Sequence, residues 1–496
     1  MTSSQSSAAN PSCPGRVFRS SATASNGSAA IRQVATRLEP FLGTFERGLD
    51  FLTIIAALYS CYGLHLALGG GNRTQYSTSG VLLSAAAFAL LFVTLLERHG
   101  AYRLYLSLLG VRETEQILRV TVESSLLALL VAYFSAIHVS WMLAMLTALA
   151  VPAFLTLQKW EMYRVVRTLR SQGHGARRAV IFGAGAVGRR IYSALLRSPK
   201  FGLDPVAFVD DDLEKSGLEI YESSYQRKRA ARVVIGSPTP ELLRQWDASA
   251  LIIAEPSLGR SAMIEMVAQL SAAGLSTYFV PQDLSRPDQW IDYDELDGML
   301  LAHVSQERPR FLYELTKRLL DFLLAALLLI VFAPLFVALA ALIKLTSPGP
   351  ALFRQERIGK KGRPFSMYKF RTMLRDTPRY GYSPRVGEDP RITRMGRLLR
   401  RTSLDELPQL LNVLRGDMSL VGPRPEMPFI VEQYSPLQRR RLAVKPGITG
   451  LWQLSGDRAF LIHENIEYDL YYVRHRSTWM DVAILLHTFL FAARGV

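Results

Sequence analysis

The first third of the sequence holds four long apolar stretches, near 49–69, 80–96, 120–138 and 140–158. Each approaches the ~20 residues that a helix needs to cross the hydrocarbon layer of a bilayer. The gaps between the stretches are short, which predicts tight helical hairpins. The sequence therefore predicts a bundle of four transmembrane helices over residues 46–160.

Basic residues flank these stretches on one side only. The segments before the first stretch, between the second and third, and after the fourth are rich in arginine. The first outer loop holds only Arg73, and the second holds neither lysine nor arginine. Because positive charge favours the cytoplasmic side, both ends of the bundle should be cytoplasmic. Residues 1–45 lack the apolar centre of a secretory signal and are expected to form a disordered cytoplasmic tail.

Length and composition limit the remaining classes. A chain of 496 residues exceeds what one core supports, since single cores stop growing near ~250–300 residues. The chain is 49% hydrophobic and 20% charged, which excludes a disordered polyelectrolyte. Two cysteines exclude a disulfide scaffold and a cysteine-rich metal site. A multidomain membrane protein, α + α/β in class, remains.

A buried strand, a glycine-rich turn and a helical pattern follow one another directly after the fourth stretch. The turn carries Gly183, Gly185 and Gly188, and a second strand ends at Asp210. This order is the Rossmann fingerprint, so we expect a Rossmann-like α/β domain over residues 176–300. The three glycines and Asp210 are candidate cofactor-binding residues. The same glycines also allow close strand–helix packing in domains that bind no nucleotide, and both interpretations stay open.

A fifth apolar stretch, residues 319–343, contains Asp321 as its only charge. It is long enough to span the bilayer, but arginine and lysine flank it on both sides, and a single crossing cannot place both flanks in the cytoplasm. Pro334 lies near its middle and can bend a helix sharply. We therefore expect a re-entrant membrane helix that breaks at Ala333–Pro334 and returns to the same face. The alternative is a fifth span with a proline kink.

Positive charge concentrates in the last part of the chain. Residues 344–496 hold 26 Lys and Arg against 14 Asp and Glu, within a total net charge of +16. Nucleic acid, anionic lipid headgroups and a phosphorylated substrate could each explain this charge. No segment resembles a module that reads nucleic acid, and attachment to a membrane favours membrane lipids and phosphate as partners.

Four motifs follow in this region. They read SPGPALFRQERIG (347–359), FSMYKFRTM (365–373), RRTSLDELPQLLNVLRGDMSLVGPRP (400–425) and KPGITGLWQ (445–453). Together they resemble the bacterial sugar transferase family, the monotopic polyprenyl-phosphate phosphoglycosyl transferases. Four spans and a Rossmann-like domain ahead of them are similar to the large subclass, of the undecaprenyl-phosphate glucose or galactose phosphotransferase type.

The resemblance implies a reaction and a place for it. A sugar-1-phosphate would pass from a UDP-sugar to undecaprenyl phosphate through a covalent aspartyl-phosphosugar, with release of UMP. This would be the first membrane step of exopolysaccharide, capsule or O-antigen synthesis, with glucose or galactose as the expected sugar. Residues 310–496 would form a mixed α/β catalytic domain on the cytoplasmic face of the bacterial inner membrane.

Asp405 and Glu406 are the candidate catalytic residues. A carboxylate at a helix start among cations can attack phosphorus and form an acyl phosphate, while cations and a metal offset charge on the phosphate oxygens. The resemblance makes Asp405 the nucleophile, with Glu406 orienting it or helping to hold Mg²⁺. Magnesium prefers carboxylate, water and phosphate oxygens, so both acids are candidate ligands. The alternative is a capping box, because residues 403–406 also match that pattern.

Several basic residues match positions in the family motifs and are expected to bind phosphate or nucleotide: Arg357, Lys369, Arg371, Arg400 and Arg424. For Lys369 and Arg371 the alternative is a basic strand face that touches lipid headgroups. The family usually has Ser-Pro at the helix break, where this chain has Ala333. An apolar stretch after Trp479 predicts an interfacial helix.

Two other functions remain as alternatives. A membrane-bound NAD-dependent nucleotide-sugar dehydratase or epimerase would need a Tyr-x-x-x-Lys pair beside its cofactor. The chain has that pattern at Tyr313 and Lys317, which lead into the fifth apolar stretch instead. A non-enzymatic scaffold for polysaccharide export is the second alternative. A homo-oligomer is compatible with the sequence.

Overall fold

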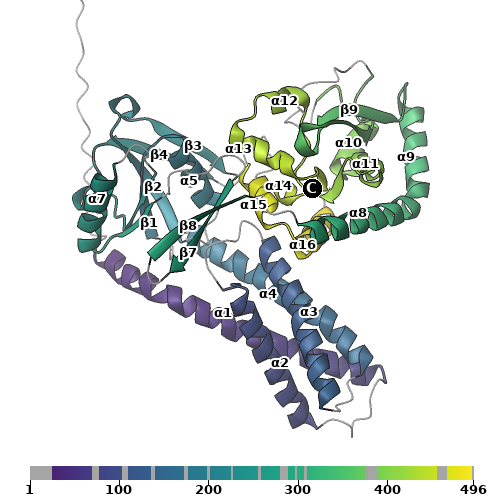
Figure 1. The fold of residues 1–496 in the computed structure, drawn as a ribbon, viewed down its shortest axis with the longest axis horizontal. Helices are drawn as coiled ribbons and strands as arrows, with labels where there is room; N and C mark the ends of the chain where they lie inside the picture. The colour runs from purple at the N-terminus through teal and green to yellow at the C-terminus, as the bar shows by residue number, and fades with distance from the viewer. Residues whose placement is uncertain are drawn as a thin grey trace, which may run out of the picture.

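The structure is a computed structural model with three parts: a helical bundle, a sheet domain and a C-terminal domain (Figure 1). It describes residues 25–69, 77–102, 110–135, 140–171, 177–197, 202–224, 227–254, 259–279, 289–296, 299–306, 310–375, 377, 389–454 and 466–493.

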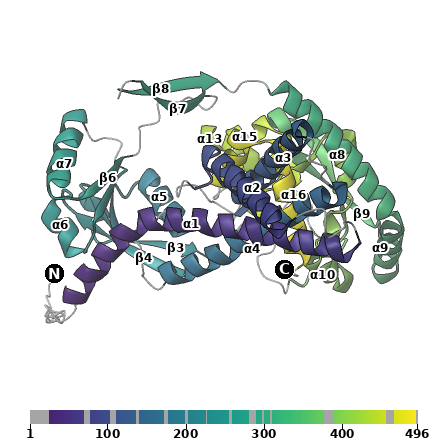
Figure 2. The same cartoon turned by 90° about the horizontal axis from the view of Figure 1, so that it is seen from below.

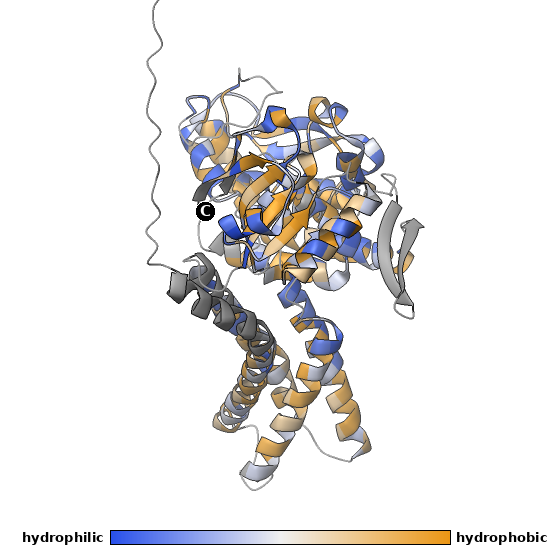
Figure 3. Cartoon of the chain, turned by 90° about the vertical axis from the view of Figure 1, so that its left-hand side faces the viewer, coloured by the Kyte–Doolittle hydropathy of each residue, from blue (hydrophilic) through white to orange (hydrophobic). Residues whose placement is uncertain are grey.

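Four long helices form the bundle: α1 (Ser25–Ala67), α2 (Thr78–Arg98), α3 (Gly110–Phe134) and α4 (Trp141–Ser171). Within the described residues, each has a segment long and apolar enough to cross a membrane: Gly43–Ala67, Ser79–Arg98, Gly110–Phe134 and Trp141–Met162. Apolar residues dominate the part of these helices that lies away from the other two domains (Figure 3). The prediction of four apolar helices is confirmed.

The bundle buries charge at one end as well as apolar side chains. Phe92, Leu96 and Leu155 are at most 1% exposed. The Nζ atom of Lys159 lies 2.7 Å from Oδ2 of Asp50, and both side chains are buried. Buried charges persist only when paired, so this contact between α1 and α4 is a specific link rather than general packing.

The first helix begins earlier than predicted. The expected tail covers residues 1–45, but α1 starts at Ser25; residues 1–24 lie outside the described residues. A helix that extends one already formed avoids the cost of nucleation, and the alanines and arginines of this segment favour helix. Helix α1 thus includes residues that the sequence assigned to the tail, and the disorder of that tail stays a prediction.

The sheet domain has six strands in the order β3-β4-β2-β1-β5-β6. The strands are β1 (Arg177–Phe182), β2 (Leu203–Asp210), β3 (Glu219–Ser224), β4 (Arg227–Ile235), β5 (Ala250–Ile253) and β6 (Ser276–Phe279). All neighbours pair in parallel except β3, which is antiparallel to β4. The helices are α5 (Ala186–Arg197), α6 (Pro240–Gln245) and α7 (Arg260–Ala272), with a short 3₁₀ turn at Leu213–Lys215.

Apolar side chains from both faces of β1 are buried, which explains its uninterrupted apolar sequence. Ala179 and Ile181 pack in one cluster, whereas Val180 and Phe182 pack in another. A separate antiparallel hairpin, β7 (Gln289–Leu296) and β8 (Met299–Gln306), follows the domain in the chain (Figure 2). The hairpin ends past residue 300, where the sequence predicted the domain to end.

The C-terminal domain begins with two helices, α8 (Phe311–Val331) and α9 (Ala333–Thr346), and a hairpin of β9 (Leu352–Ile358) and β10 (Pro364–Phe370). The remaining strands, β11 (Ser419–Val421) and β12 (Gly447–Thr449), are parallel. The other helices are α10 (Arg394–Arg401), α11 (Gln409–Arg415), α12 (Pro428–Glu432), α13 (Pro436–Arg439), α14 (Leu451–Leu454), α15 (Glu467–His475) and α16 (Thr478–Ala493). Short 3₁₀ turns lie at Lys360–Gly362, Leu404–Glu406 and Arg440–Ala443.

The last helix, α16, is buried near its start and exposed near its end. Met480, Ala483 and Ile484 are buried in the core of the C-terminal domain, whereas Phe489 and Leu490 are 74% and 53% exposed. The start of α3 also reaches this domain, because Val111 joins the same core. The bundle and the C-terminal domain are therefore packed against each other.

The fifth apolar stretch is a bent pair of helices. The axes of α8 and α9 differ by 62°. The break falls at Phe332, one residue before the predicted Ala333–Pro334 break, and Pro334 lies in the first turn of α9. A proline at a helix start loses no hydrogen bond, because the first N–H groups of a helix have no partner within it. Pro334 thus begins the second helix instead of kinking one continuous helix.

Candidate active site

Asp405 and Glu406 lie in the 3₁₀ turn between α10 and α11. Ser403, just before them, has left-handed backbone geometry with φ 56°, and its side chain makes no capping hydrogen bond. Helix α11 begins only at Gln409, after Pro408. The capping-box alternative is therefore wrong. The two acids lie in a turn and do not cap the start of a helix.

Glu406 is held between two cations. Its Oε1 accepts hydrogen bonds from Nζ of Lys369 at 2.8 Å and from Nη2 of Arg424 at 2.9 Å. Lys369 comes from β10, and Arg424 comes from the loop after β11. Burial favours a higher pKa for Glu406, but the charges of Arg424 and Lys369 outweigh burial and hold that pKa at about 2. Glu406 is therefore an anion at any physiological pH.

Asp405 differs from its neighbour. Its side chain is buried, at 8% residue exposure, and its carboxylate accepts no hydrogen bond from the residues that the structure describes. Burial raises the pKa of Asp405, and the Glu406 charge raises it further, although Lys369 and Arg424 oppose the shift. A desolvated carboxylate without a hydrogen-bond partner, in a cationic surrounding, is well placed to attack an electrophilic phosphorus.

Two more of the predicted arginines belong to this cationic region. Arg400 donates from Nε to Oγ1 of Thr372 at 2.9 Å, and burial lowers its pKa while Asp405 opposes that shift. Arg357 donates to the carbonyl of Pro425 at 3.3 Å, next to Arg424. Burial and the neighbouring Arg424 lower the pKa of Arg357 to about 10. Clustered cations destabilise one another, so an anion bound here would relieve that repulsion.

Arg371 has a different environment from the one predicted. Its guanidinium donates to the carbonyls of Ser347 and Pro348, both at 2.8 Å, and to Oγ of Ser347 at 2.7 Å. A Cβ atom on Gly349, where φ is +119°, would lie 2.2 Å from Nη1 of Arg371. These contacts fix the chain that leaves α9 against the end of β10. Arg371 therefore ties the segment that follows α9 to the end of β10.

Sequence reasoning missed a buried ion pair behind Arg424. The Nη2 atom of Arg441 donates to the backbone carbonyl of Arg424 at 2.9 Å and lies 2.6 Å from Oδ2 of Asp469. Its Nη1 donates to the hydroxyl of Tyr434 at 2.6 Å. Arg441 and Asp469 are almost fully buried. Because Arg441 holds the Arg424 backbone, it positions the cation that contacts Glu406.

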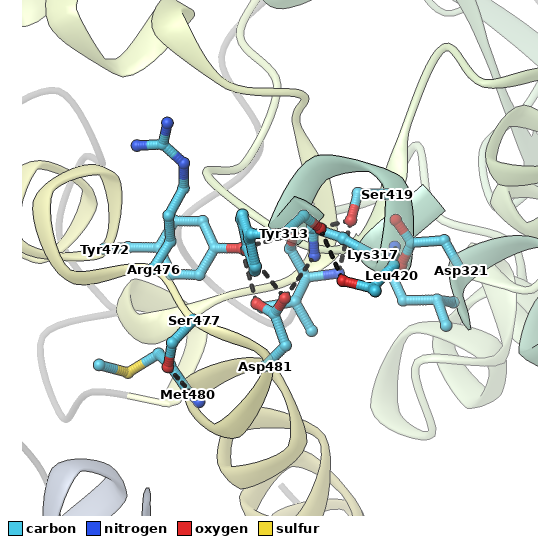
Figure 4. Close-up of polar contacts among 12 residues, drawn as sticks. Tyr313, Lys317, Asp321, Ser419, Leu420, Tyr472, Arg476, Ser477, Met480 and Asp481 are labelled. Atoms are coloured by element: carbon cyan, nitrogen blue, oxygen red, sulfur yellow. Dashed lines mark hydrogen bonds and ion pairs between the residues drawn. The ribbon is translucent and has the colours of Figure 1, made fainter. Parts of the chain in front are cut away.

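Figure 4 shows how α8 is attached to the same domain. Oδ2 of Asp481 on α16 accepts hydrogen bonds from Tyr313 and Lys317, both at 2.9 Å, and its Oδ1 accepts one from Tyr472 at 2.7 Å. Further along α8, Oδ1 of Asp321 accepts the backbone N–H of Leu420 at 3.1 Å. Tyr313 and Lys317 therefore serve this attachment, and they are not the catalytic pair that a dehydratase or epimerase needs.

The glycine turn of the sheet domain is explained by packing. Gly183 has φ +102°, and a Cβ on Gly188 would lie 1.8 Å from the carbonyl oxygen of Gly183. Asp210 is fully buried, and its Oδ2 accepts the backbone N–H of Ala184 at 2.6 Å and lies 3.1 Å from Nζ of Lys215. Asp210, one of the candidate cofactor-binding residues, holds the turn that precedes α5. A Cβ on Gly185 would meet nothing within 4 Å.

The donor set at the site fits magnesium. Among the described residues, no group of three or more His, Cys, Asp or Glu side chains forms a metal cluster. Asp405 and Glu406 supply two adjacent carboxylates, and Mg²⁺ usually takes one or two carboxylates together with waters and substrate phosphates. If magnesium binds here, these two carboxylates would supply its protein ligands, and waters and a substrate phosphate would supply the rest.

Two sequence profiles match the chain. One, described as bacterial sugar transferase, covers residues 312–495, and the other, described as a CoA-binding domain, covers residues 97–281. The first match contains every residue of the cluster around Glu406. The second contains the glycine turn and Asp210.

Three named relatives are similar to parts of the chain. The UDP-glucose:undecaprenyl-phosphate glucose-1-phosphate transferase of Caulobacter vibrioides is 49% identical over 211 residues, 40% of this chain and 78% of that protein. The Escherichia coli K12 protein of the same name is 31% identical over 328 residues, 64% of this chain and 68% of that protein. The UDP-N-acetylgalactosamine-undecaprenyl-phosphate N-acetylgalactosaminephosphotransferase of Aeromonas hydrophila is 42% identical over 186 residues, 36% of this chain and 44% of that protein's length.

Proposed function

Because the chain belongs to the bacterial sugar transferase family, we propose that it is a phosphoglycosyl transferase that moves a sugar-1-phosphate from a UDP-sugar to undecaprenyl phosphate. The observation that carries the proposal is the contrast between two adjacent acids. Glu406 is fixed as an anion by Lys369 and Arg424, whereas Asp405 is buried and accepts no hydrogen bond from the described residues. Glu406 holds Lys369 and Arg424 in place, and Asp405 remains available to react.

The reaction proceeds in two displacements at one phosphorus atom. An oxygen of Asp405 attacks the β-phosphorus of the UDP-sugar, and the bond to the oxygen bridging the two phosphates breaks. UMP leaves with that electron pair, and the sugar phosphate stays on Asp405 as an acyl phosphate. A phosphate oxygen of undecaprenyl phosphate then attacks the same phosphorus. The bond to Asp405 breaks, which restores the carboxylate and yields the lipid diphosphate sugar.

The surrounding cations stabilise the charge that develops in both steps. Arg424, Lys369 and Arg400 all act electrostatically on Asp405, so each can also act on phosphate oxygens bound there. Arg357, beside Arg424, binds the diphosphate of the nucleotide. Magnesium held by Asp405 and Glu406 would neutralise phosphate charge when bound.

The bent helix pair is re-entrant in this proposal. Glu314 precedes the apolar stretch and Lys360 follows it, yet Nζ of Lys360 lies 3.3 Å from Oε2 of Glu314. A straight helix over residues 319–343 would separate its ends by about 36 Å, at 1.5 Å per residue. The contact supports a hairpin that returns to the face it entered. Together with the bundle's basic flanks, this contact supports the proposal that the catalytic domain lies at the cytoplasmic face of the inner membrane, where UDP-sugars are available.

The sheet domain is Rossmann-like in this proposal, since parallel strands flank a central β1 that leads into the glycine turn. Its role is structural rather than catalytic. Supporting this, Asp210 is engaged with the backbone of Ala184 and with Lys215. Redox chemistry on a nucleotide is therefore not part of the proposed reaction.

The proposed sugar is glucose or galactose, and the step would initiate synthesis of an extracellular polysaccharide. The relatives from Caulobacter and E. coli are named for glucose-1-phosphate, and the Aeromonas relative for N-acetylgalactosamine. Purified full-length protein with undecaprenyl phosphate should release UMP from one of UDP-glucose, UDP-galactose or UDP-N-acetylgalactosamine. Equal inactivity with all three would argue against these donors.

The covalent step has a direct test. Asp405→Asn keeps the side-chain shape but removes the nucleophile, so UMP release and labelling of the protein from a UDP-sugar labelled in its β-phosphate should both disappear. Glu432→Gln, at an exposed position on α12, is the matched control and should retain both. If Asp405→Asn still releases UMP at the wild-type rate, Asp405 is not the nucleophile and the proposed mechanism fails.

A further inference from the structure

Helix α10 has an inner and an outer face. On the inner face, Gly396 lies so close to β10 that a Cβ atom would be 2.0 Å from the carbonyl oxygen of Thr372. The outer face carries three exposed arginines: Arg394, Arg397 and Arg401. Positions i, i+3 and i+7 project from one side of a helix, so the three guanidinium groups share one surface. We call these three residues the α10 face.

The α10 face carries charge that the protein does not neutralise. Arg391, nearby, pairs with Asp389, with Nη2 at 2.6 Å from Oδ2. No such ion pair involves an arginine of the α10 face in the part of the chain that the structure describes. The proposed substrate site already has its own cations. The α10 face is therefore an additional positive surface.

An exposed leucine lies among these arginines, and the neighbouring helix α9 has exposed apolar side chains of its own. Helix α10 packs on α9 through Leu399, which shares a buried cluster with Leu339 and Ile343 (Figures 1 and 2). Outside this contact, Leu345 on α9 is 83% exposed, and Leu398, between the arginines, is 54% exposed. Apolar side chains of this size beside unpaired arginines match the boundary of a bilayer, where hydrocarbon gives way to charged headgroups.

We propose that the α10 face binds the phosphate groups of anionic phospholipids at the surface of the bilayer. Two observations commit the surface to this partner: its unpaired positive charge complements an anionic leaflet, and the exposed apolar side chain of Leu398 lies among the three arginines. The same helix carries Arg400, which contacts Thr372 beside the site. Lipid binding here would hold the candidate active site near the phospholipid headgroups. This goes beyond the proposed transfer reaction, because it concerns bulk lipids rather than the acceptor.

The test measures retained lipid in place of activity. Full-length protein is exchanged into detergent that contains equal amounts of phosphatidylglycerol and phosphatidylcholine, and the ratio of the two lipids that stay bound is measured by mass spectrometry. Wild-type protein should retain phosphatidylglycerol preferentially. The triple variant Arg394→Gln, Arg397→Gln, Arg401→Gln should lower the ratio, by about fivefold per arginine at low salt if each contributes fully. Added salt should lower the wild-type ratio towards that of the variant.

Two matched variants make the result decisive. The triple variant Arg178→Gln, Arg244→Gln, Arg439→Gln removes the same charge from exposed positions elsewhere and should keep the wild-type ratio. Lysine at the three positions of the α10 face keeps the charge and should also keep the ratio. The proposal is overturned if glutamine on the α10 face leaves the ratio unchanged, or if the control triple lowers it equally. Neither outcome bears on Asp405, because UMP release is not the readout.

Discussion

The Nζ atom of Lys369, on the edge of a β-hairpin, lies 2.8 Å from Oε1 of Glu406, which lies 37 residues later in a 3₁₀ turn. The contact fixes the turn against the hairpin and places a permanent negative charge next to Asp405. Glu406 raises the pKa of Asp405, whereas Lys369 lowers it. Glu406 and Lys369 therefore shift the pKa of Asp405, the proposed nucleophile, in opposite directions.

Substitutions of the two partners should shift the pH dependence of UMP release in opposite directions. In the proposed reaction, Asp405 attacks as the ionised carboxylate, so the rate should rise as pH passes upward through its pKa. Glu406→Gln removes a charge that raises this pKa and should move the acidic limb to lower pH. Lys369→Met removes a charge that lowers it and should move the limb to higher pH. Both variants should also lose about 10²–10³ in rate, the usual scale for a preorganised electrostatic contact.

Single-turnover UMP release, measured across a pH series for both variants and the wild type, checks this prediction. Glu432→Gln serves as the control for a charge change far from the turn, and its profile should overlay the wild-type profile. A shift of both variants in the same direction would show that the acidic limb does not report Asp405.

Arg441 should influence the reaction through the Arg424 backbone that it holds. Arg441→Lys keeps a positive charge near Asp469, but an ammonium cannot also reach the Arg424 carbonyl and the Tyr434 hydroxyl in the fork geometry of a guanidinium. We expect kcat for UMP release to fall by about tenfold to a hundredfold, because small displacements of a positioned group carry large kinetic costs.

A purely structural role for Arg441 would give a different pattern. It would lower the unfolding temperature and the yield of active protein, but leave the kcat of the folded fraction unchanged. Arg439→Lys, at an exposed position two residues earlier, is the matched control. Active-site titration by the covalent phosphosugar separates the two cases. Wild-type kcat per labelled Arg441→Lys molecule would contradict the positioning role.

The cluster around Glu406 was predictable because its members are charged residues that lie within the family motifs. Lys369, Glu406 and Arg424 are distant in sequence, yet each was a candidate, and the structure brings them together. Arg371 shows the limit of this reasoning. It is two positions from Lys369, and the sequence gives no sign that its donors reach the backbone at Ser347.

Other features depended on tertiary contacts that no local pattern records. In the sequence, Arg441 is the last of three consecutive arginines. Its positioning role depends on contacts with the buried carboxylate of Asp469 and the backbone carbonyl of Arg424. The start of α1 at Ser25 also depends on more than the local pattern. Low hydropathy argued for disorder, while helix propensity and continuity with the following span favoured helix.

Packing predicts that alanine substitutions at two glycines of the sheet domain have different effects on its stability, whether or not a cofactor binds. A methyl group on Gly188 would meet the Gly183 carbonyl at 1.8 Å, whereas one on Gly185 would meet nothing within 4 Å. Gly188→Ala should therefore destabilise the domain by roughly 1–3 kcal/mol or more, the cost of overpacking, while Gly185→Ala changes stability little. Thermal unfolding of the two variants without added nucleotide checks this, and equal unfolding temperatures would contradict it.

The bent pair of α8 and α9 predicts that Glu314 and Lys360 face the same compartment. In a chain whose two native cysteines are replaced, Glu314→Cys and Lys360→Cys should both react with a membrane-impermeant maleimide in inverted vesicles and not in spheroplasts. Ser79→Cys, at the opposite end of the bundle on α2, should react in spheroplasts only. The physical reason is the 3.3 Å ion pair between residues that a straight span would hold about 36 Å apart or more. Labelling of Lys360→Cys from the outside would place Asp405 beyond the reach of cytoplasmic UDP-sugars, and the proposed reaction could not occur there.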